Sequence, residues 1–327
     1  MQRFRKEEEL TMDTVMEVQD LKKYFKTPSG MCHAVDGVDL SIERGKTIGI
    51  VGESGCGKST LGRTMIHLSE STDGKIIFNG EDITHVGKSR LKMLRERMQI
   101  IFQDPFSSLN PRMTAYETIQ EPLQISGNVT KKEIEKKTVS LMRMVGIDKR
   151  IENSYPHELD GGRRQRIVIA RALALSPELV ICDEPVSALD VSIQAQILNL
   201  LQDLQETMKL TYVFITHDMS VVRYLSQYIC VMYLGQVVER CPTEQLFEQP
   251  LHPYTRALLS AIPVPDIHVP RKRVILQGEV TSPINPKPGC RFRSRCPYAA
   301  KACKQEQKLR ETESGHYVMC SRIKEIG

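Results

Sequence analysis

The residues that most clearly support chemistry form a glycine-rich run at positions 52–60. This run, Gly-Glu-Ser-Gly-Cys-Gly-Lys-Ser-Thr, fits the P-loop pattern G-x-x-x-x-G-K-[ST]. Such a loop turns backbone N–H groups toward phosphate oxygens at the start of a helix. Lys58 would reach the β and γ phosphates, and the Ser59 hydroxyl would ligate magnesium. The pattern favours a nucleotide site over a glycine-rich turn without a ligand. The expected nucleotide contacts are Gly52, Glu53, Ser54, Gly55, Cys56, Gly57, Lys58, Ser59 and Thr60.

Two carboxylates follow a second apolar run, at 179–183. Asp183 and Glu184 at the end of this run fit a Walker B element. Asp183 would hold magnesium through water, and Glu184 would polarise the attacking water as general base. An acidic pair at a strand end is often only a helix N-cap, but the P-loop upstream favours catalysis. His217 follows a third apolar run; a lone histidine there is usually structural, but it can face the same γ phosphate.

Alternating strand and helix patterns must position these residues. Apolar runs at 47–51, 179–183 and 210–216 predict buried strands, and each precedes a helical pattern. This alternation predicts an α/β domain with a mostly parallel sheet, in which ligands bind at the carboxyl ends of the strands. Between 105 and 176 the pattern is helical throughout, which indicates a helical insertion. The expected helices there are 116–126, 131–145 and 163–175.

The last part of the chain, residues 256–327, differs in texture and charge. It holds 14 basic and 6 acidic residues in a chain whose net charge is +5, and its prolines argue against a second regular sheet. Four cysteines follow the spacing C-x5-C-x6-C-x16-C, with basic residues around them that would favour the thiolate form. These cysteines are Cys290, Cys296, Cys303 and Cys320, and the basic residues are Arg291, Arg293, Arg295, Lys301 and Lys304.

The four cysteines indicate a metal centre that would help to fold a proline-rich segment with little core of its own. Structural zinc usually shows C-x2-4-C pairs, and their absence tilts the choice toward iron–sulfur. Zinc and free thiols remain alternatives, because spacing alone does not fix a metal. His316 could replace one ligand, although a surface position is the simpler interpretation.

Composition excludes several classes of protein. The chain has 327 residues, 40% hydrophobic and 26% charged, as expected for a globular protein. No apolar run approaches the roughly 18 residues that span a bilayer, and residues 1–13 lack the apolar stretch of an export signal. The small positive charge does not predict nucleic-acid binding.

The ordered motifs resemble the ATP-binding subunits of ABC transporters over about 15–259. Gln103 in Ile-Phe-Gln-Asp matches the glutamine loop, which ligates magnesium and senses the membrane subunit. Residues 187–190 match the D-loop, and His217 matches the switch histidine. Phe25 matches the aromatic residue that stacks on adenine, with Tyr24 as the next candidate. Three segments resemble more narrowly the oligopeptide, dipeptide and nickel importer branch, at 104–111, 184–196 and 250–255.

The resemblance implies a P-loop NTPase (RecA-like) α/β core with an ABC helical subdomain and an antiparallel β subdomain. A nucleotide-binding domain would span 1–255, with its helical subdomain at about 105–176. A small irregular cysteine-containing extension would span 256–327. Some importer ATPases carry a 4Fe-4S cluster on these cysteines. The implied ligands are therefore ATP, Mg²⁺ and that cluster.

The implied activity is ATP hydrolysis that energises import of oligopeptides or dipeptides. The implied partners are a second ABC ATPase subunit, two transmembrane permease subunits and an extracytoplasmic solute-binding protein, with no nucleic acid. The chain would lie peripherally on the cytoplasmic face of the cell membrane. Alternatives are an ATP-binding regulatory subunit with little turnover, import of nickel or another small solute, and a soluble ABC ATPase that acts on ribosomes.

One motif departs from the family. The signature Leu-Ser-Gly-Gly-Gln is here Leu-Asp-Gly-Gly-Arg at 159–163. In the family this segment caps the γ phosphate of the opposite subunit, so Asp160, Gly161, Gly162 and Arg163 are expected nucleotide contacts. A carboxylate about 4 Å from that phosphate would cost roughly 4 kcal/mol per charge pair. Arg163 or Arg164 could pair with Asp160, or Asp160 could cap the following helix. Either a weakened ATP site in a heterodimer or harmless drift could result.

Overall fold

The computed structural model describes residues 14–127, 129–262, 274–278, 281–313 and 315–326. The chain divides into two compact units, which are described separately. Unit 1 comprises Met1–Ile42, Thr47–Thr84 and Phe214–Gly327. Unit 2 comprises Glu43–Lys46 and His85–Val213. The amino-terminal stretch without an export signal lies outside the described residues.

Unit 1 contains the P-loop, the two β-sheet regions and the cysteine segment. The strands are β1 (Thr14–Thr27), β2 (Gly30–Glu43), β3 (Thr47–Val51), β4 (Asp73–Phe78), β5 (Glu81–Asp82), β9 (Tyr228–Tyr233), β10 (Gln236–Pro242), β11 (Arg310–Glu313) and β12 (His316–Val318). The helices are α2 (Lys58–Met65), α9 (Met219–Leu225), α10 (Thr243–Glu248), α11 (Pro253–Ser260) and α12 (Ile323–Ile326), with a 3-10 helix η3 (Lys301–Lys304).

One sheet of unit 1 has the strand order β2-β1-β4-β5, and β4 runs antiparallel to both β1 and β5. This confirms the expected antiparallel β subdomain. The other sheet runs in the order β11-β12-β10-β9-β3 within this unit, with β3 parallel to β9. Every residue of β3 is buried, because α9 packs on this strand and β9 flanks it. The apolar run at 47–51 thus forms the buried strand that the sequence predicted.

The carboxyl-terminal extension contributes to this second sheet. Strand β12 pairs antiparallel with both β10 and β11, so the last part of the chain adds two strands at the edge. The rest of the described extension is mainly irregular, as its proline content predicted.

Unit 2 is predominantly helical. Its helices are α3 (Lys88–Arg97), α4 (Pro105–Ser108), α5 (Ala115–Ser126), α6 (Lys131–Met144), α7 (Gly161–Leu173) and α8 (Val191–Met208), with 3-10 helices η1 (Lys149–Ile151) and η2 (Pro156–Glu158). Its strands are β6 (Met98–Ile101) and β7 (Leu179–Asp183), which run parallel. Strand β8 (Thr211–Thr216) begins in unit 2 and ends in unit 1.

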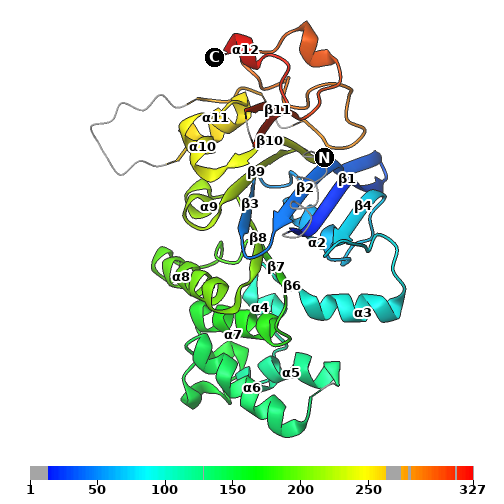
Figure 1. Ribbon diagram of the computed structural model, residues 1–327. Coiled ribbons are helices and arrows are strands. Elements are labelled where there is room, and N and C mark those ends of the chain that lie inside the picture. Colours follow the sequence, from blue (N-terminus) through cyan, green and yellow to red (C-terminus); the bar gives the residue numbers. More distant parts are fainter. Residues whose placement is uncertain (1–13, 128, 263–273, 279–280, 314, 327) are drawn as a thin grey trace, which may run out of the picture. The chain divides into compact units, whose positions relative to one another are not determined.

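The helical insertion has the form that the sequence predicted. Helices α5, α6 and α7 pack on one another (Figure 1), and no described residue between 105 and 176 is in a strand. Thr114 and Thr130 begin α5 and α6, and a glutamate three residues further on closes each capping box. Within the described residues, no helix is both long and apolar enough to cross a bilayer.

Candidate active site

The P-loop of unit 1 curves around its own lysine. Lys58 is 4% exposed, and its Nζ donates to the carbonyl oxygens of Gly52 (2.8 Å) and Glu53 (3.1 Å). Its Nζ also lies 3.9 Å from Sγ of Cys56, and burial raises the pKa of that thiol. The lysine is therefore held at the centre of the loop, where it can bind phosphate oxygens that approach from solvent.

Glycine is required where this loop passes close to other backbone. Gly57 has φ +107°, and a Cβ there would lie 2.0 Å from the Ala34 carbonyl oxygen. A Cβ on Gly52 would lie 2.2 Å from the carbonyl oxygen of Met232 in β9. Helix α2 begins directly after Gly57, so the positive end of its dipole lies at the loop. The remaining loop positions, Ser54, Gly55, Ser59 and Thr60, are exposed or half-buried.

Two aromatic residues of β1 compete for the adenine role. The ring of Tyr24 stacks on His33 with 4.0 Å between centroids, and its hydroxyl donates to Asp36. Phe25 is 42% exposed, and Nζ of Lys23 lies 4.9 Å from its ring centroid. Because Tyr24 is committed to protein contacts, Phe25 has the more accessible face for a base.

The acidic end of β7 lies in unit 2. Asp183 is 1% exposed, and Glu184 follows it with φ +49°, a left-handed conformation that is strained for a glutamate. Gln103 Nε2 donates to Oε2 of Glu184 at 3.1 Å, so the glutamine-loop and general-base candidates lie together. Such a contact can orient a carboxylate for proton transfer from water.

His217 lies in unit 1, exposed directly after the end of β8. The next residue, Asp218, caps α9 by accepting the N–H of Ser220 at 2.8 Å. The N-cap of α9 is therefore Asp218 and not His217.

The variant signature at 159–163 lies at the start of α7 in unit 2. Oδ1 of Asp160 accepts the N–H of Arg163 at 2.8 Å, which makes Asp160 the N-cap, and Nε of Arg163 lies 3.3 Å from Oδ2. Both compensations considered from the sequence therefore occur together. The two side chains are 61% and 54% exposed, so the ion pair adds little beyond the cap. Arg164 instead donates to the Pro156 carbonyl at 2.7 Å.

The four cysteines of the extension interact with one another electrostatically. Burial raises the pKa of Cys290 to about 11, and the neighbouring thiols Cys303, Cys296 and Cys320 raise it further. Burial also raises the pKa values of Cys296 and Cys320. Among the described residues no disulfide joins two cysteines, and no three histidine, cysteine or acidic side chains are grouped to hold one metal ion.

The arginines around these thiols do not have the role that the sequence suggested. Arg291 pairs with Asp36, Arg295 pairs with Glu53, and Arg293 donates to the Pro288 carbonyl. The expectation that they favour thiolates was wrong for Arg291 and Arg295, because carboxylates elsewhere in unit 1 bind them. Arg322, which was not singled out, interacts electrostatically with Cys303 and Cys296.

His316 is not a surface residue. It is 1% exposed, and its Nε2 lies 2.8 Å from Oε1 of Glu239, which is fully buried. Glu239 also accepts the N–H groups of Leu251 and His252, at 2.7 and 2.9 Å. The surface interpretation was wrong because strand β12 joins the sheet beside β10 and buries this histidine.

The P-loop follows the buried parallel strand β3, and a carboxylate pair follows the parallel strand β7. Together these features define the nucleotide site of a P-loop NTPase. The family model for ABC transporters matches residues 35–187, and the model for the oligopeptide/dipeptide transporter C-terminal region matches 238–303. The chain belongs to the ATP-binding proteins of ABC transporters, in the oligopeptide/dipeptide branch. Its enzymatic activity is ATP hydrolysis.

Relatives cover nearly the whole chain. The oligopeptide transport ATP-binding protein AppF of Bacillus subtilis is 50% identical over 94% of this chain and 97% of its own length. The oligopeptide transport ATP-binding protein OppF of Escherichia coli is 47% identical over 94% of this chain and 93% of its own length.

A solved structure of the cassette MJ0796 bound to ADP and Pi matches with TM-score 0.64 and 29% identity, over 70% of this chain and 98% of that one. A second match is cbiO1 of Clostridium perfringens, with TM-score 0.65 and 27% identity, over 72% and 92% of the two chains. These matches confirm the P-loop NTPase fold that the sequence predicted.

Proposed function

We propose that ATP hydrolysis by this chain drives import of oligopeptides or dipeptides through a membrane permease. The observation that carries this proposal is the match of residues 238–303 to the C-terminal region of oligopeptide/dipeptide transporters, in a chain with a complete P-loop. The relatives AppF and OppF are oligopeptide transport ATP-binding proteins, which favours peptides over nickel as the imported solute.

Different residues of the site bind the phosphates, the adenine and the magnesium ion. Lys58 and the loop N–H groups bind the β and γ phosphates, and Phe25 stacks on the adenine. Ser59, Gln103 and Asp183 would hold Mg²⁺, which neutralises phosphate charge when bound. The hydroxyl, amide and carboxylate oxygens of these three residues are the donor types that this ion prefers.

The proton transfer is assigned to Glu184. Its carboxylate accepts a proton from the water that attacks the γ phosphorus, and the hydrogen bond from Gln103 orients it. His217 donates a hydrogen bond to the γ phosphate. The phosphate–ADP bond breaks as the new phosphorus–oxygen bond forms, and inorganic phosphate leaves.

A second ATPase subunit completes the proposed machine. In a heterodimer, this chain's Lys58, Asp183 and Glu184 would work with an intact partner signature. Asp160 and Arg163 would serve the weaker second site, because Asp160 adds negative charge there. The remaining partners are two permease subunits and an extracytoplasmic solute-binding protein, and the chain would lie peripherally on the cytoplasmic face of the membrane.

Replacing Glu184 tests this division of labour. In the complete transporter, Glu184→Gln should lower ATP turnover about a hundredfold or more, because the amide cannot accept the proton from water. Turnover per complex at saturating ATP is the measurement. Glu206→Gln is the matched control, since this glutamate is exposed on α8 of the same unit and lies outside the site motifs. If the Glu184→Gln variant hydrolyses ATP at the wild-type rate, the ATP site that contains this chain's Lys58, Asp183 and Glu184 is not the active one.

We also propose a four-iron cluster on Cys290, Cys296, Cys303 and Cys320. Four cysteines in one short extension support it, because thiolates are the ligands of such clusters, and the Cys290 N–H donates to the Cys303 carbonyl at 2.9 Å. Protein purified without oxygen should absorb near 400 nm and contain iron; zinc without iron would contradict the proposal.

The domain division follows the same logic. Residues 1–255 would form the nucleotide-binding domain, with its helical subdomain at about 105–176, and 256–327 would form the extension. The change in charge at this boundary supports the division.

A further inference from the structure

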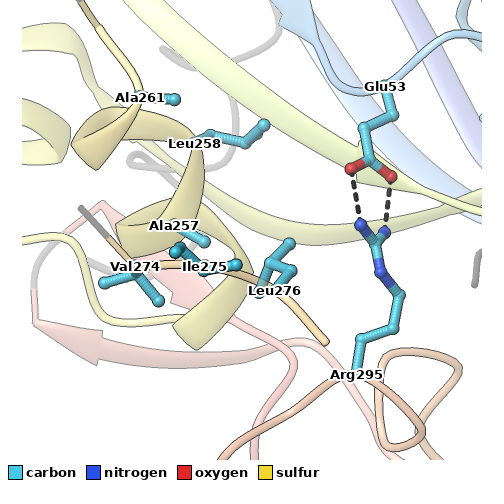
Figure 2. A pocket seen from close by; sticks show the side chains of 8 residues that line it. All are labelled: Glu53, Ala257, Leu258, Ala261, Val274, Ile275, Leu276 and Arg295. Atoms are coloured by element: carbon cyan, nitrogen blue, oxygen red, sulfur yellow. Dashed lines mark hydrogen bonds and ion pairs between the residues drawn. The ribbon is translucent and has the colours of Figure 1, made fainter. Parts of the chain in front are cut away.

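An ion pair connects the cysteine segment to the P-loop within unit 1. Nη1 of Arg295 lies 2.7 Å from Oε2 of Glu53, and Nη2 lies 3.0 Å from Oε1. Figure 2 shows the guanidinium and the carboxylate facing each other in this two-point contact. The arginine side chain is 9% exposed and the glutamate 30% exposed. A bidentate contact of this kind orients the carboxylate and also compensates its charge.

The same loop residue is held at its backbone. The N–H of Glu53 donates to the Tyr254 hydroxyl at 2.9 Å, and its carbonyl accepts from Lys58. Tyr254 is fully buried in α11, where its ring packs against Tyr233 and Phe292, with centroids 4.7 and 5.4 Å away. Side chain, N–H and carbonyl of Glu53 therefore all have partners, and two of these come from the carboxyl-terminal part of the chain.

A second arginine of the cysteine segment supports the loop from another side. Arg291 is 6% exposed, pairs with Asp36 and donates to the Leu234 carbonyl. The next residue, Gly235, donates its N–H to the carbonyl of Cys56 in the P-loop at 2.7 Å. Phe292 lies between the two arginines and is 1% exposed. The segment 291–295 thus supports the P-loop at its second and its fifth residue.

Charge makes the contact with Glu53 relevant to the nucleotide. Glu53 places a carboxylate on a loop that binds an anionic triphosphate, and like charges in such a site repel. The hydrogen bonds to Glu53 raise the pKa of Arg295, so the guanidinium is charged and neutralises the carboxylate. If the arginine is lost, an unpaired negative charge remains on the loop.

We propose that Arg295 and Tyr254 are positioning residues of the ATP site, which hold Glu53 so that the P-loop keeps its shape and presents no net negative charge to the triphosphate. The inference rests on the nucleotide site proposed above. It gives the cysteine segment a supporting part in ATP binding, through Glu53.

The experiment measures binding of a fluorescent ATP analogue to the full chain. Arg295→Gln should weaken binding about tenfold, as expected for coupling within one charged network. In the assembled transporter the same change should raise KM for ATP much more than it changes kcat. Glutamine is shorter than arginine, so it fits without a steric clash at this position, which adjoins a cavity of about 430 Å³. Arg293→Gln is the matched control, because this arginine is in the same segment and donates to the Pro288 carbonyl, outside the P-loop, and it should change binding less than twofold.

A double variant distinguishes positioning of Glu53 from simple attachment of the cysteine segment to the rest of unit 1. Glu53→Gln combined with Arg295→Gln should recover most of the lost affinity, because the unpaired carboxylate is then gone. A merely structural pair would instead lower the unfolding temperature of the nucleotide-free chain and leave the affinity unchanged. Tyr254→Phe keeps the ring and loses the hydroxyl, and it should weaken binding about threefold even if Arg295→Gln does not fold.

Two outcomes overturn different claims. If wild type binds the analogue and Arg295→Gln and Tyr254→Phe bind it equally well, this inference is wrong and the proposed function stands. If wild type and Lys58→Ala bind the analogue alike, the nucleotide site itself is misassigned.

Discussion

The P-loop and the variant signature at 159–163 both contain glycines and both lie at the start of a helix, but different kinds of contact hold them. At the P-loop, Glu53 binds Arg295 from 242 residues away and Tyr254 from 201 residues away. At the signature, Asp160 binds Arg163, three residues away. The first helix start has no side-chain cap, whereas the second has one. The phosphate loop therefore depends on the folded carboxyl-terminal part of unit 1, and the signature is locally self-contained.

This difference also explains how substitutions are tolerated. A local cap can be exchanged for another capping residue, since only one backbone N–H needs a partner. A loop held at several points by distant groups has little freedom to relax, because each of those groups is fixed by its own packing. We therefore expect changes at the P-loop to have larger effects than matched changes at the signature.

Matched glycine substitutions should show the largest contrast. Gly57→Ala should lower the free energy of unfolding by about 2–4 kcal/mol and abolish nucleotide binding, because φ is +107° and the Cβ would meet the Ala34 carbonyl at 2.0 Å. Gly161→Ala should cost less than about 1 kcal/mol, since its Cβ meets only the end of the Leu189 side chain at 3.0 Å. Denaturant unfolding of both variants is the measurement, and equal losses would refute the contrast.

Acidification should weaken the support of the P-loop. His252 caps α11 by accepting the Tyr254 N–H on Nδ1 at 3.1 Å, which requires a neutral ring. Burial lowers the pKa of His252 to about 4, against the opposing charge of Glu239. The unfolded chain therefore binds a proton below about pH 6.5 that the folded chain does not. The free energy of unfolding should fall as pH drops from 6.5 toward 4, by about 2 kcal/mol at pH 5.

Unfolding measured across this pH range checks the assignment. His252→Asn keeps a capping side chain without an ionisable ring, so its stability should depend less on pH between 6.5 and 4. An unchanged pH dependence in this variant would mean that another group is responsible.

The smallest effects are expected at the signature. Asp160→Ser keeps an N-cap and should change the free energy of unfolding by less than about 0.5 kcal/mol, whereas Asp160→Ala should cost about 1 kcal/mol. Asp160→Ser also removes the carboxylate, so turnover by the assembled transporter should rise if this charge weakens the second ATP site. Thermal unfolding and ATPase assays on the pair of variants separate the capping role from the charge effect.

Much of the fold followed from periodicity. The buried strands at 47–51 and 179–183 and the three helices of the insertion were predicted, because their patterns are local and strongly periodic. The edge strands β11 and β12 were not, since β11 is fully exposed and has no alternating apolar face. His316 was misjudged for the same reason: its burial comes from the pairing of β12 with β10.

The sequence alone determined the chemistry of the P-loop, the acidic pair and the capping role open to Asp160. Each of these depends on residues a few positions apart, where backbone geometry fixes which groups can meet. Only the tertiary structure decided that Glu53 binds Arg295 and that Asp36 binds Arg291. The chain has 45 lysines and arginines and 40 acidic residues, and no local pattern selects one partner among them at such a separation. Phe292, in the sequence between the two arginines, packs against Tyr233 and Tyr254, and this packing holds the segment where both pairs can form.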